Sequence, residues 1–179
     1  MEYRNLPRGK EKIGVIGLGT SSMGAAGAGE MERILQLAIE KGINYFDLAS
    51  GDDKPFAVFG RELQDIREKV YYQIHFGAQY ERGVYGWTTD LEKIKKSVDW
   101  QLRQLKTDYI DFGFLHCIDE EEDLRRIANN GVVSHILRLK EEGAVRHIGL
   151  SSHTPSVVNQ VLDMGTVSYT HLDVYKRQL

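Results

Sequence analysis

Four apolar stretches of this 179-residue sequence each end in a polar side chain that could take part in chemistry. The four residues are Asp47, His75, His116 and Ser151. A carboxylate or an imidazole at the end of a buried strand is costly unless it is paired or functional. Imidazole and carboxylate groups serve in general acid–base catalysis and as zinc ligands, so the set predicts a catalytic or metal site. A hydrogen-bonded structural histidine, or an aspartate that caps a helix, is the alternative at each position.

These residues need strands to position them. Short apolar segments rich in β-branched and aromatic residues predict strands at 13–18, 44–49, 70–76, 109–118 and 147–151. Helical periodicity, caps and terminal glycines predict helices between and after them at 31–41, 55–65, 89–105, 132–142 and 155–164. The pattern Thr89-Asp90-Leu91-Glu92 is typical of a capping box. Alternating strands and helices predict a parallel sheet covered by helices, whose functional groups gather where strands end.

Two architectures fit this alternation, an open doubly wound sheet and a closed barrel. Gly17-Leu18-Gly19-Thr20-Ser21-Ser22 lacks the third glycine of the dinucleotide-binding turn, which disfavours the doubly wound sheet. A (β/α)8 barrel needs about 250 residues, and five units here take up roughly 165. We therefore predict an α/β fold, namely a (β/α)8 TIM barrel truncated after about five βα units, in a partial barrel domain at residues 1–166.

The last residues differ from the rest of the sequence. A sixth strand should be a compact apolar run, but residues 167–179 are polar and weakly periodic. The string VSYTHLDVYKRQ resembles translated adapter-like sequence at the ends of some metagenomic gene fragments. We expect a non-native tail at 167–179 that lacks a full sixth-strand ladder; a frayed native terminus is the alternative.

Composition narrows the class of protein. The formal net charge of −3 gives no electrostatic case for a nucleic acid or an anionic membrane surface. No apolar run approaches the roughly 18 residues of a membrane span. Cys117 is the one cysteine, which excludes an internal disulfide and a cysteine-only metal site. We expect a cytoplasmic protein without nucleic-acid or membrane partners.

Several motifs resemble one family, the aldo/keto reductases. They are Met1–Leu6 and Ile16–Thr20, which resemble the family's opening hairpin and first barrel strand, and Gly42–Asp47, Ser97–Asp111 with Leu115-His116, and Arg146–His153. The resemblance covers about residues 1–166 in order. It implies a barrel that binds NADP(H) and transfers hydride between the cofactor and a small-molecule carbonyl or alcohol. It also implies a catalytic tetrad, in which a tyrosine donates a proton with the help of a lysine and an aspartate while a histidine orients the substrate.

Only half of that tetrad is present at the matching positions. Asp47 matches the aspartate and His116 matches the histidine. The tyrosine position holds Asp52, and the lysine position holds His75. An aspartate carboxyl is ordinarily ionised near neutral pH and then has no proton to donate. The resemblance therefore implies catalytic roles for Asp47, His116, His75 and Asp52, with altered acid–base chemistry.

Other residues near these positions offer substitutes. Lys54 could take the place of the lysine, and Tyr80 or Tyr85 that of the tyrosine. Trp87 is a candidate for lining a substrate pocket, whereas Trp100 falls inside a predicted helix and is expected to pack in the outer ring.

The resemblance also implies cofactor contacts. Gly19 and Thr20 match positions under the nicotinamide, and Ser151 matches a serine that contacts its carboxamide. Ser152 stands where the family usually has asparagine, and we include it as a candidate contact. Members with similar motifs can carry a C-terminal iron–sulfur segment, which is possible beyond this sequence. Because the family's phosphate-binding loops follow later strands, we expect the chain as written not to turn over the cofactor.

Two other functions compete with an oxidoreductase. Asp47, His75, His116 and His153 are acceptable zinc ligands from neighbouring strand ends, which would fit a metal-dependent hydrolase. Because no closely spaced ligand pair supports this function, we predict no metal site. A barrel that has lost catalysis and serves as a regulatory protein is the second alternative.

Strand alternation predicts that Asp47, His75 and His116 point into one concavity.

Overall fold

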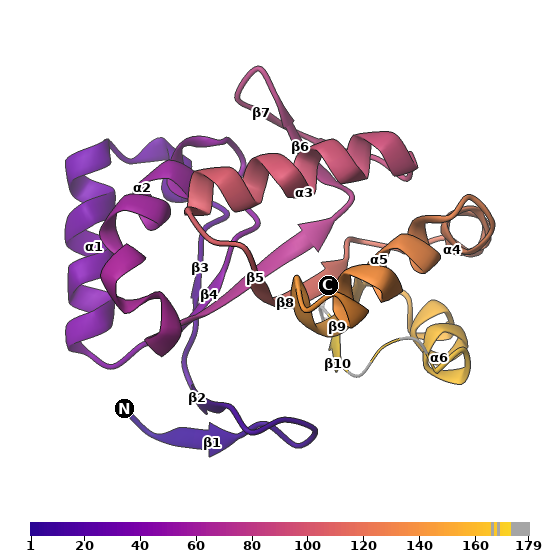
Figure 1. Ribbon diagram of the computed structural model, residues 1–179, viewed down its shortest axis with the longest axis horizontal. Helices are drawn as coiled ribbons and strands as arrows, with labels where there is room; N and C mark the ends of the chain where they lie inside the picture. The colour runs from indigo at the N-terminus through magenta and orange to yellow at the C-terminus, as the bar shows by residue number, and fades with distance from the viewer. Residues whose placement is uncertain (166, 168, 173–179) are drawn as a thin grey trace, which may run out of the picture.

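The structure, a computed structural model, describes residues 1–165, 167 and 169–172. Its main sheet is parallel, with the strand order β10-β9-β8-β5-β4-β3 (Figure 1). The strands are β3 (Leu18–Gly19), β4 (Tyr45–Asp47), β5 (Tyr71–Phe76), β8 (Ile110–Leu115), β9 (Val145–Ser152) and β10 (Tyr169–Leu172). Their order along the chain is also their order across the sheet. A doubly wound sheet reverses its strand order at a switch point, and the described strands contain no such reversal.

Helices connect these strands and cover the outer face of the sheet. They are α1 (Ala28–Glu40), α2 (Lys54–Glu62), α3 (Leu91–Leu105), α4 (Glu121–Asn129), α5 (Val132–Glu141) and α6 (Pro155–Asp163), with short 3₁₀ turns η1 (Met23–Ala25) and η2 (Gln64–Lys69). Parallel neighbours joined by helical crossovers are the architecture of a (β/α)8 barrel. The described strands form an open sheet of six where a closed barrel has eight. The predicted fold class, a TIM barrel truncated after about five units, is confirmed.

The core lies between the helices and the sheet. Helix α1 buries Met31, Leu35 and Ala38, which share one face because they are four and three residues apart. The helix ends at Gly42, whose φ of +81° favours glycine and whose amide donates to the Ile39 carbonyl. The sequence predicted both the apolar face and the terminal glycine.

An aromatic cluster joins α2 to the sheet. The rings of Phe46, Phe59 and Tyr72 meet edge to face with centroids 5.3–6.4 Å apart, and all three side chains are fully buried. Edge-to-face contacts of this kind add to the stabilisation from buried apolar area. This packing fixes β4 and β5, the two strands that carry Asp47 and His75.

Two sequence predictions for local structure are wrong. The continuous strand at 13–18 is broken: β2 (Lys12–Gly14) pairs antiparallel with β1 (Tyr3–Asn5), and only Leu18–Gly19 joins the main sheet. Glycines within this stretch weaken a long strand. Helix α3 is capped by Asp90, which accepts a hydrogen bond from the Lys93 amide at 2.9 Å, and not by Thr89 as the capping-box pattern predicted.

A second hairpin was not predicted. β6 (Ala78–Glu81) and β7 (Val84–Trp87) pair antiparallel directly after β5. In Figure 1 this hairpin projects at the top, while the β1–β2 hairpin crosses the opposite end of the sheet. Arg82 and Gly83 form the turn with φ of 54° and 81°, as a type I′ hairpin turn requires at both central positions. The β6–β7 hairpin therefore stands over the carboxyl ends of the parallel strands.

The structure describes part of the predicted tail. The sequence predicted that a full sixth-strand ladder would be lacking, and the structure shows a ladder of four residues, in which Tyr169–Leu172 pair in parallel with Gly149–Ser152. An open edge of β9 offers unpaired backbone groups that an extended segment can satisfy. Residues 173–179 lie outside the described part, and the non-native origin of 167–179 stays a prediction. In the part of the chain that is described, no helix has the length and apolar character needed to cross a membrane.

Candidate active site

Three side chains from neighbouring strand ends meet on the inner side of the sheet. The His75 ring lies between the other two: its Nε2 is 2.6 Å from Asp47 Oδ1, and its Nδ1 is 2.9 Å from Nδ1 of His116. The two histidines are buried, whereas the Asp47 side chain is 32% exposed. Because β4 pairs with β5 and β5 with β8, the ends of these strands are adjacent. The prediction that the three side chains share one concavity is confirmed.

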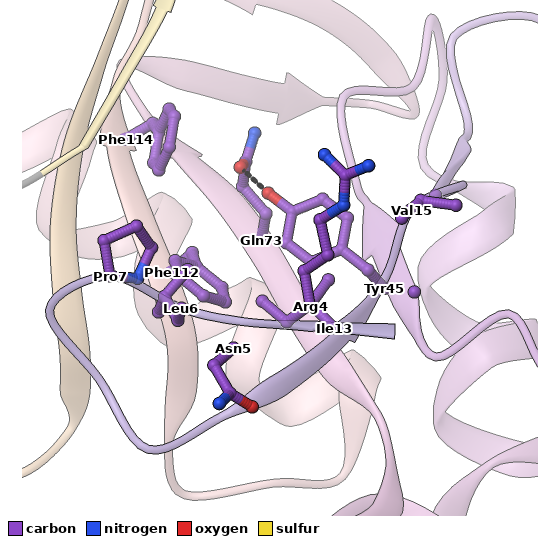
Figure 2. A pocket seen from close by; sticks show the side chains of 12 residues that line it. Arg4, Asn5, Leu6, Pro7, Ile13, Val15, Tyr45, Gln73, Phe112 and Phe114 are labelled. Carbon is purple, nitrogen blue, oxygen red and sulfur yellow. Dashed lines mark hydrogen bonds between the residues drawn. The ribbon is translucent and has the colours of Figure 1, made fainter. Parts of the chain in front are cut away.

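A second layer supports this cluster from below. The Tyr45 hydroxyl donates a hydrogen bond to Gln73 Oε1, and Gln73 Nε2 lies 3.1 Å from His75 Nε2. Figure 2 shows this pair with Phe112 and Phe114 on the wall of an open cavity of about 600 Å³, whose other side is lined by the β1–β2 hairpin. Burial raises the pKa of Tyr45. The layer below His75 is thus a hydrogen-bonded polar pair set in an apolar wall, and it fixes the plane of the imidazole.

The β6–β7 hairpin brings a tyrosine to the other end of the cluster. The Tyr85 hydroxyl is 2.9 Å from His116 Nε2, and the two rings meet at 88°. The Trp87 indole N–H donates to the His116 carbonyl at 2.8 Å, which anchors the hairpin beside the histidine. The sequence made Trp87 a candidate for lining a substrate pocket. In the structure its indole N–H anchors the hairpin to the His116 carbonyl. The local sequence signal for this hairpin was Gly83, a residue type that readily adopts the positive φ that its turn requires.

Burial controls the ionisation of the cluster. Burial and the neighbouring His75 lower the pKa of His116 to about 3. The His116 ring is therefore neutral at physiological pH, with one N–H donor and one acceptor nitrogen. Burial also raises the pKa of Tyr85, so its hydroxyl keeps its proton. The neutral His116 ring and the protonated Tyr85 phenol can each donate and accept a hydrogen bond.

Asp52 and Lys54 are not part of this cluster. Asp52 Oδ1 accepts a hydrogen bond from the Lys54 amide at 3.0 Å, and its other oxygen lies 3.5 Å from Lys54 Nζ. Lys54 Nζ also donates to the Gly24 carbonyl at 3.2 Å. The two residues therefore interact with each other and with η1, and the structure does not bring them to His75.

Tyr80, the other candidate tyrosine, points to the helical layer. Its ring packs against Phe56 and Trp100 with centroids 4.8 and 5.4 Å apart. Trp100 also contacts Phe56 at 5.2 Å, so its predicted packing in the outer ring is confirmed. Of the two tyrosines considered from the sequence, Tyr85 alone is hydrogen-bonded to the cluster.

The predicted cofactor contacts of β3 lie beside the cluster. Gly19 is open: no atom lies within 4 Å of the place where a Cβ would be. A flat ring can approach the backbone closely at such a glycine. The Thr20 hydroxyl instead donates to the Asp47 carbonyl at 3.1 Å, and its amide donates to the same oxygen at 3.0 Å. Thr20 therefore ties β3 to the end of β4.

The two predicted serines at the end of β9 differ in their contacts. Ser151 Oγ accepts from the Cys117 amide at 3.0 Å and donates weakly to the Leu115 carbonyl at 3.3 Å. Ser152 Oγ donates to Asp119 Oδ1 at 3.2 Å. The long Ser151 contact can be exchanged for a ligand, whereas the bond from Ser152 goes to a carboxylate and is the stronger kind.

The fourth proposed zinc ligand, His153, lies apart. Its Nδ1 is 2.7 Å from Asp119 Oδ2, and its amide donates to Asp119 Oδ1 at 2.6 Å. Hydrogen bonds from His153 and Ser152 outweigh burial and lower the pKa of Asp119. Among the described residues, no three His, Cys, Asp or Glu side chains are arranged to hold a metal ion. The geometry thus does not gather the four residues on which the hydrolase alternative depends.

Comparison with known proteins gives one consistent result. The sequence profile of the aldo/keto reductase family matches residues 15–174. The uncharacterized oxidoreductase YqkF of Bacillus subtilis (strain 168) is 32% identical over 171 residues, which are 93% of this chain and 54% of YqkF. L-glyceraldehyde 3-phosphate reductase of Escherichia coli (strain K12) is 25% identical over 174 residues, 92% of this chain and 49% of that enzyme.

The structural likeness is equally extensive. The holo form of aldo-keto reductase AKR11C1 from Bacillus halodurans has a TM-score of 0.81 and 26% sequence identity, and the match covers 97% of this chain and 57% of that one. The chain thus spans about half the length of the relatives it matches.

Proposed function

The chain belongs to the aldo/keto reductase family, and from that premise we propose that it forms part of an NADP(H)-dependent oxidoreductase. Its substrate would be a small-molecule carbonyl compound or the corresponding alcohol. Asp47, His75 and His116 would handle the proton that accompanies hydride transfer. The observation that carries this proposal is the row of these three side chains, linked by 2.6 and 2.9 Å contacts at the carboxyl ends of adjacent strands.

The place of these residues supports a catalytic role. Active sites of (β/α)8 barrels lie at the carboxyl ends of the strands, where the cluster is found. Buried polar groups with shifted pKa values gather at functional sites, and His116 is such a group. Because a histidine replaces the lysine of the usual tetrad, the proton would pass through an imidazole instead of being made available by an ammonium group.

The cofactor fits part of the predicted set. The nicotinamide would lie over the open backbone of Gly19, and Ser151 could turn its weakly bonded hydroxyl to the carboxamide. Thr20 and Ser152 are held by Asp47 and Asp119, so we do not propose that they contact the cofactor. When bound, the cofactor supplies the hydride donor or acceptor.

The single cysteine and the net charge bear on the cofactor, the cellular setting and the partners of the protein. Cys117 is the single cysteine of the sequence, so these residues hold no cysteine-ligated iron–sulfur cluster, and we propose none for this chain. The lack of a cysteine pair supports a reducing, cytoplasmic setting. The formal net charge of −3 gives no electrostatic support for a nucleic-acid or membrane partner.

The test is nicotinamide oxidation with a panel of small aldehydes and ketones, using a natural chain that covers the full length of the family. His75→Gln should lower kcat by about 100-fold, the usual scale of lost acid–base catalysis. Nicotinamide affinity, measured by fluorescence, should change little. His135→Gln makes the same change on α5, beside Arg138, and should keep kcat within about 2-fold. A wild-type protein that binds no nicotinamide would contradict the proposal, as would equal activity in the two variants.

A further inference from the structure

The contacts between Asp47 and Tyr85 form one continuous row. Asp47 Oδ1 meets His75 Nε2 at 2.6 Å, the two histidines meet through their Nδ1 atoms at 2.9 Å, and His116 Nε2 meets the Tyr85 hydroxyl at 2.9 Å. Each imidazole thus uses both of its ring nitrogens within the row. One end is a partly exposed carboxylate, and the other is a partly exposed phenol.

We propose that Tyr85 is the proton donor and acceptor for the substrate oxygen, and that His116 and His75 relay its proton to and from Asp47. The inference rests on the proposed function and deepens it by assigning the residue that replaces the family's tyrosine. Tyr85 would be a catalytic residue, whereas His75 acts on the substrate only through the row.

The hydrogen bonds of the row can point in either of two directions, here called the outward and the inward order, which differ in the number of protons that the row holds. A neutral imidazole carries one N–H, and each hydrogen bond needs one proton between its two atoms. In the outward order, the Asp47 carboxyl donates to His75 Nε2, His75 Nδ1–H donates to His116, and His116 Nε2–H donates to the Tyr85 oxygen. The Tyr85 O–H then points out of the row. In the inward order, Asp47 is ionised and every hydrogen bond is reversed, so that Tyr85 O–H donates to His116 Nε2.

The two orders differ by one proton, which is the proton that the reaction consumes or releases. In reduction, the Tyr85 O–H bond breaks and its proton binds the carbonyl oxygen while hydride from a reduced nicotinamide binds the carbon. Tyr85 takes a proton from His116 Nε2, His116 Nδ1 takes one from His75, and His75 Nε2 takes one from Asp47. The row ends in the inward order with Asp47 ionised. Alcohol oxidation runs the same transfers in reverse, with oxidised nicotinamide as the hydride acceptor.

The second layer fits the outward order. Gln73 Oε1 accepts from Tyr45, so the Gln73 amide N–H₂ is the group that faces His75 Nε2 at 3.1 Å. A donor in that position is compatible with a His75 Nε2 that carries no proton, as in the outward order, whereas an ionised Asp47 at 2.6 Å from the same nitrogen favours a proton there, as in the inward order.

The ionisation of the inner groups also fits a relay. Burial and His75 keep His116 neutral by lowering its pKa to about 3, so His116 passes a proton on and does not hold a second one. Burial raises the pKa of Tyr85, which keeps the phenol protonated between turnovers. Asp47 is ordinarily ionised near neutral pH, and its 32% exposed side chain can take up from solvent the proton that converts the inward order to the outward order.

The fold brings Tyr85 next to the position that the family's tyrosine would occupy. Asp52, which stands at that position, forms a backbone bridge with Val84, and the Tyr85 amide donates to the Gly51 carbonyl at 3.4 Å. The Trp87 indole bond to the His116 carbonyl fixes the other side of the hairpin. Tyr85 therefore reaches the same histidine from a neighbouring strand.

The test compares two matched variants in the full-length natural chain. Tyr85→Phe should lower kcat by about 100-fold or more, with nicotinamide affinity unchanged. Tyr80→Phe makes the same change on β6, in a ring packed against Phe56 and Trp100, and should keep kcat within about 3-fold. A second measurement needs no cofactor: nitrogen-15 NMR should show one fixed tautomer of His116 in the wild type and a mixture in Tyr85→Phe.

The outcomes separate the two proposals. If the wild type oxidises nicotinamide and Tyr85→Phe behaves as Tyr80→Phe does, the relay is wrong and the proposed function stands. If Tyr85→Phe loses nicotinamide binding together with kcat, Tyr85 has a structural role and the relay is wrong. A His116 tautomer that is unaffected by Tyr85→Phe overturns the relay in the same way. A wild type without any nicotinamide chemistry overturns the proposed function and, with it, the inference.

Discussion

Mild acid should destabilise this protein through His116. The side chain is 8% exposed, and burial is the main cause that lowers its pKa to about 3. Around it, His75 and His153 oppose a positive ring while Asp47 and Asp119 favour one, and burial with the two histidines prevails. In the unfolded chain the same ring is surrounded by water and titrates near its ordinary value of 6.5. Protonation thus favours the unfolded chain.

The sign and size follow from proton linkage. Between the folded value of about 3 and the unfolded value of 6.5, the unfolded chain binds more protons, so the free energy of unfolding falls as the pH falls. The contribution of His116 is fully present above about pH 6.5 and is lost progressively down to about pH 3. At about 1.4 kcal/mol per pH unit within this window, going from about pH 7 to about pH 5 costs about 2 kcal/mol.

Urea unfolding at the two pH values measures this loss. His116→Gln keeps a polar side chain but does not titrate, so its loss between the two pH values should be about 2 kcal/mol smaller than that of the wild type. His135→Gln is the control: burial and Arg138 lower the pKa of His135, but its half-buried side chain should change the loss much less. An equal loss in the wild type and His116→Gln would refute the reasoning.

Three further changes test the scaffold by the same unfolding measurement. Asp111 is fully buried and hydrogen-bonded to Arg67 at 2.8 Å, so Asp111→Asn should cost about 3 kcal/mol, whereas Asp108→Asn at the surface should cost almost nothing. A Cβ at Gly60 would collide with a backbone carbonyl of α3, so Gly60→Ala should cost about 1–3 kcal/mol despite the better helix propensity of alanine. Asp90→Ala removes the cap of α3 and should cost about 1 kcal/mol. A stability gain in Gly60→Ala, or no change in the other two, would contradict these assignments.

The sequence was a good guide wherever a local pattern decides the structure. Helix α1 follows from an apolar face and a terminal glycine, and the parallel sheet follows from alternating strands and helices. The meeting of Asp47, His75 and His116 also follows from local facts, because side chains alternate along a strand and adjacent parallel strands end at the same edge. Side-chain alternation and the shared edge of adjacent strands are enough to bring the three side chains together, and neither depends on loops that are distant in sequence.

Local sequence patterns gave wrong predictions where alternative contacts compete for the same segment or side chain. Residues 13–18 are apolar enough for a strand, but part of the stretch pairs with β1 in a separate hairpin instead of joining the main sheet. Asp52 was placed in the site by its position in a motif, yet its carboxylate bonds to Lys54. A motif position fixes where the backbone goes, whereas the direction of a side chain depends on which charges and donors surround it.

The most informative failure concerns the β6–β7 hairpin. Its strands are four residues long, too short for a strong alternating signal, and its position depends on contacts distant in sequence: the Asp52–Val84 bridge and the Trp87 bond to the His116 carbonyl. These contacts make Tyr85 a neighbour of the loop in which the family's tyrosine is expected. A proton donor must lie within hydrogen-bond reach of the substrate oxygen, and it need not come from a particular strand. A tyrosine supplied across a β-bridge can meet that requirement as well as one supplied along the chain, so the proposed relay does not need a tyrosine at position 52.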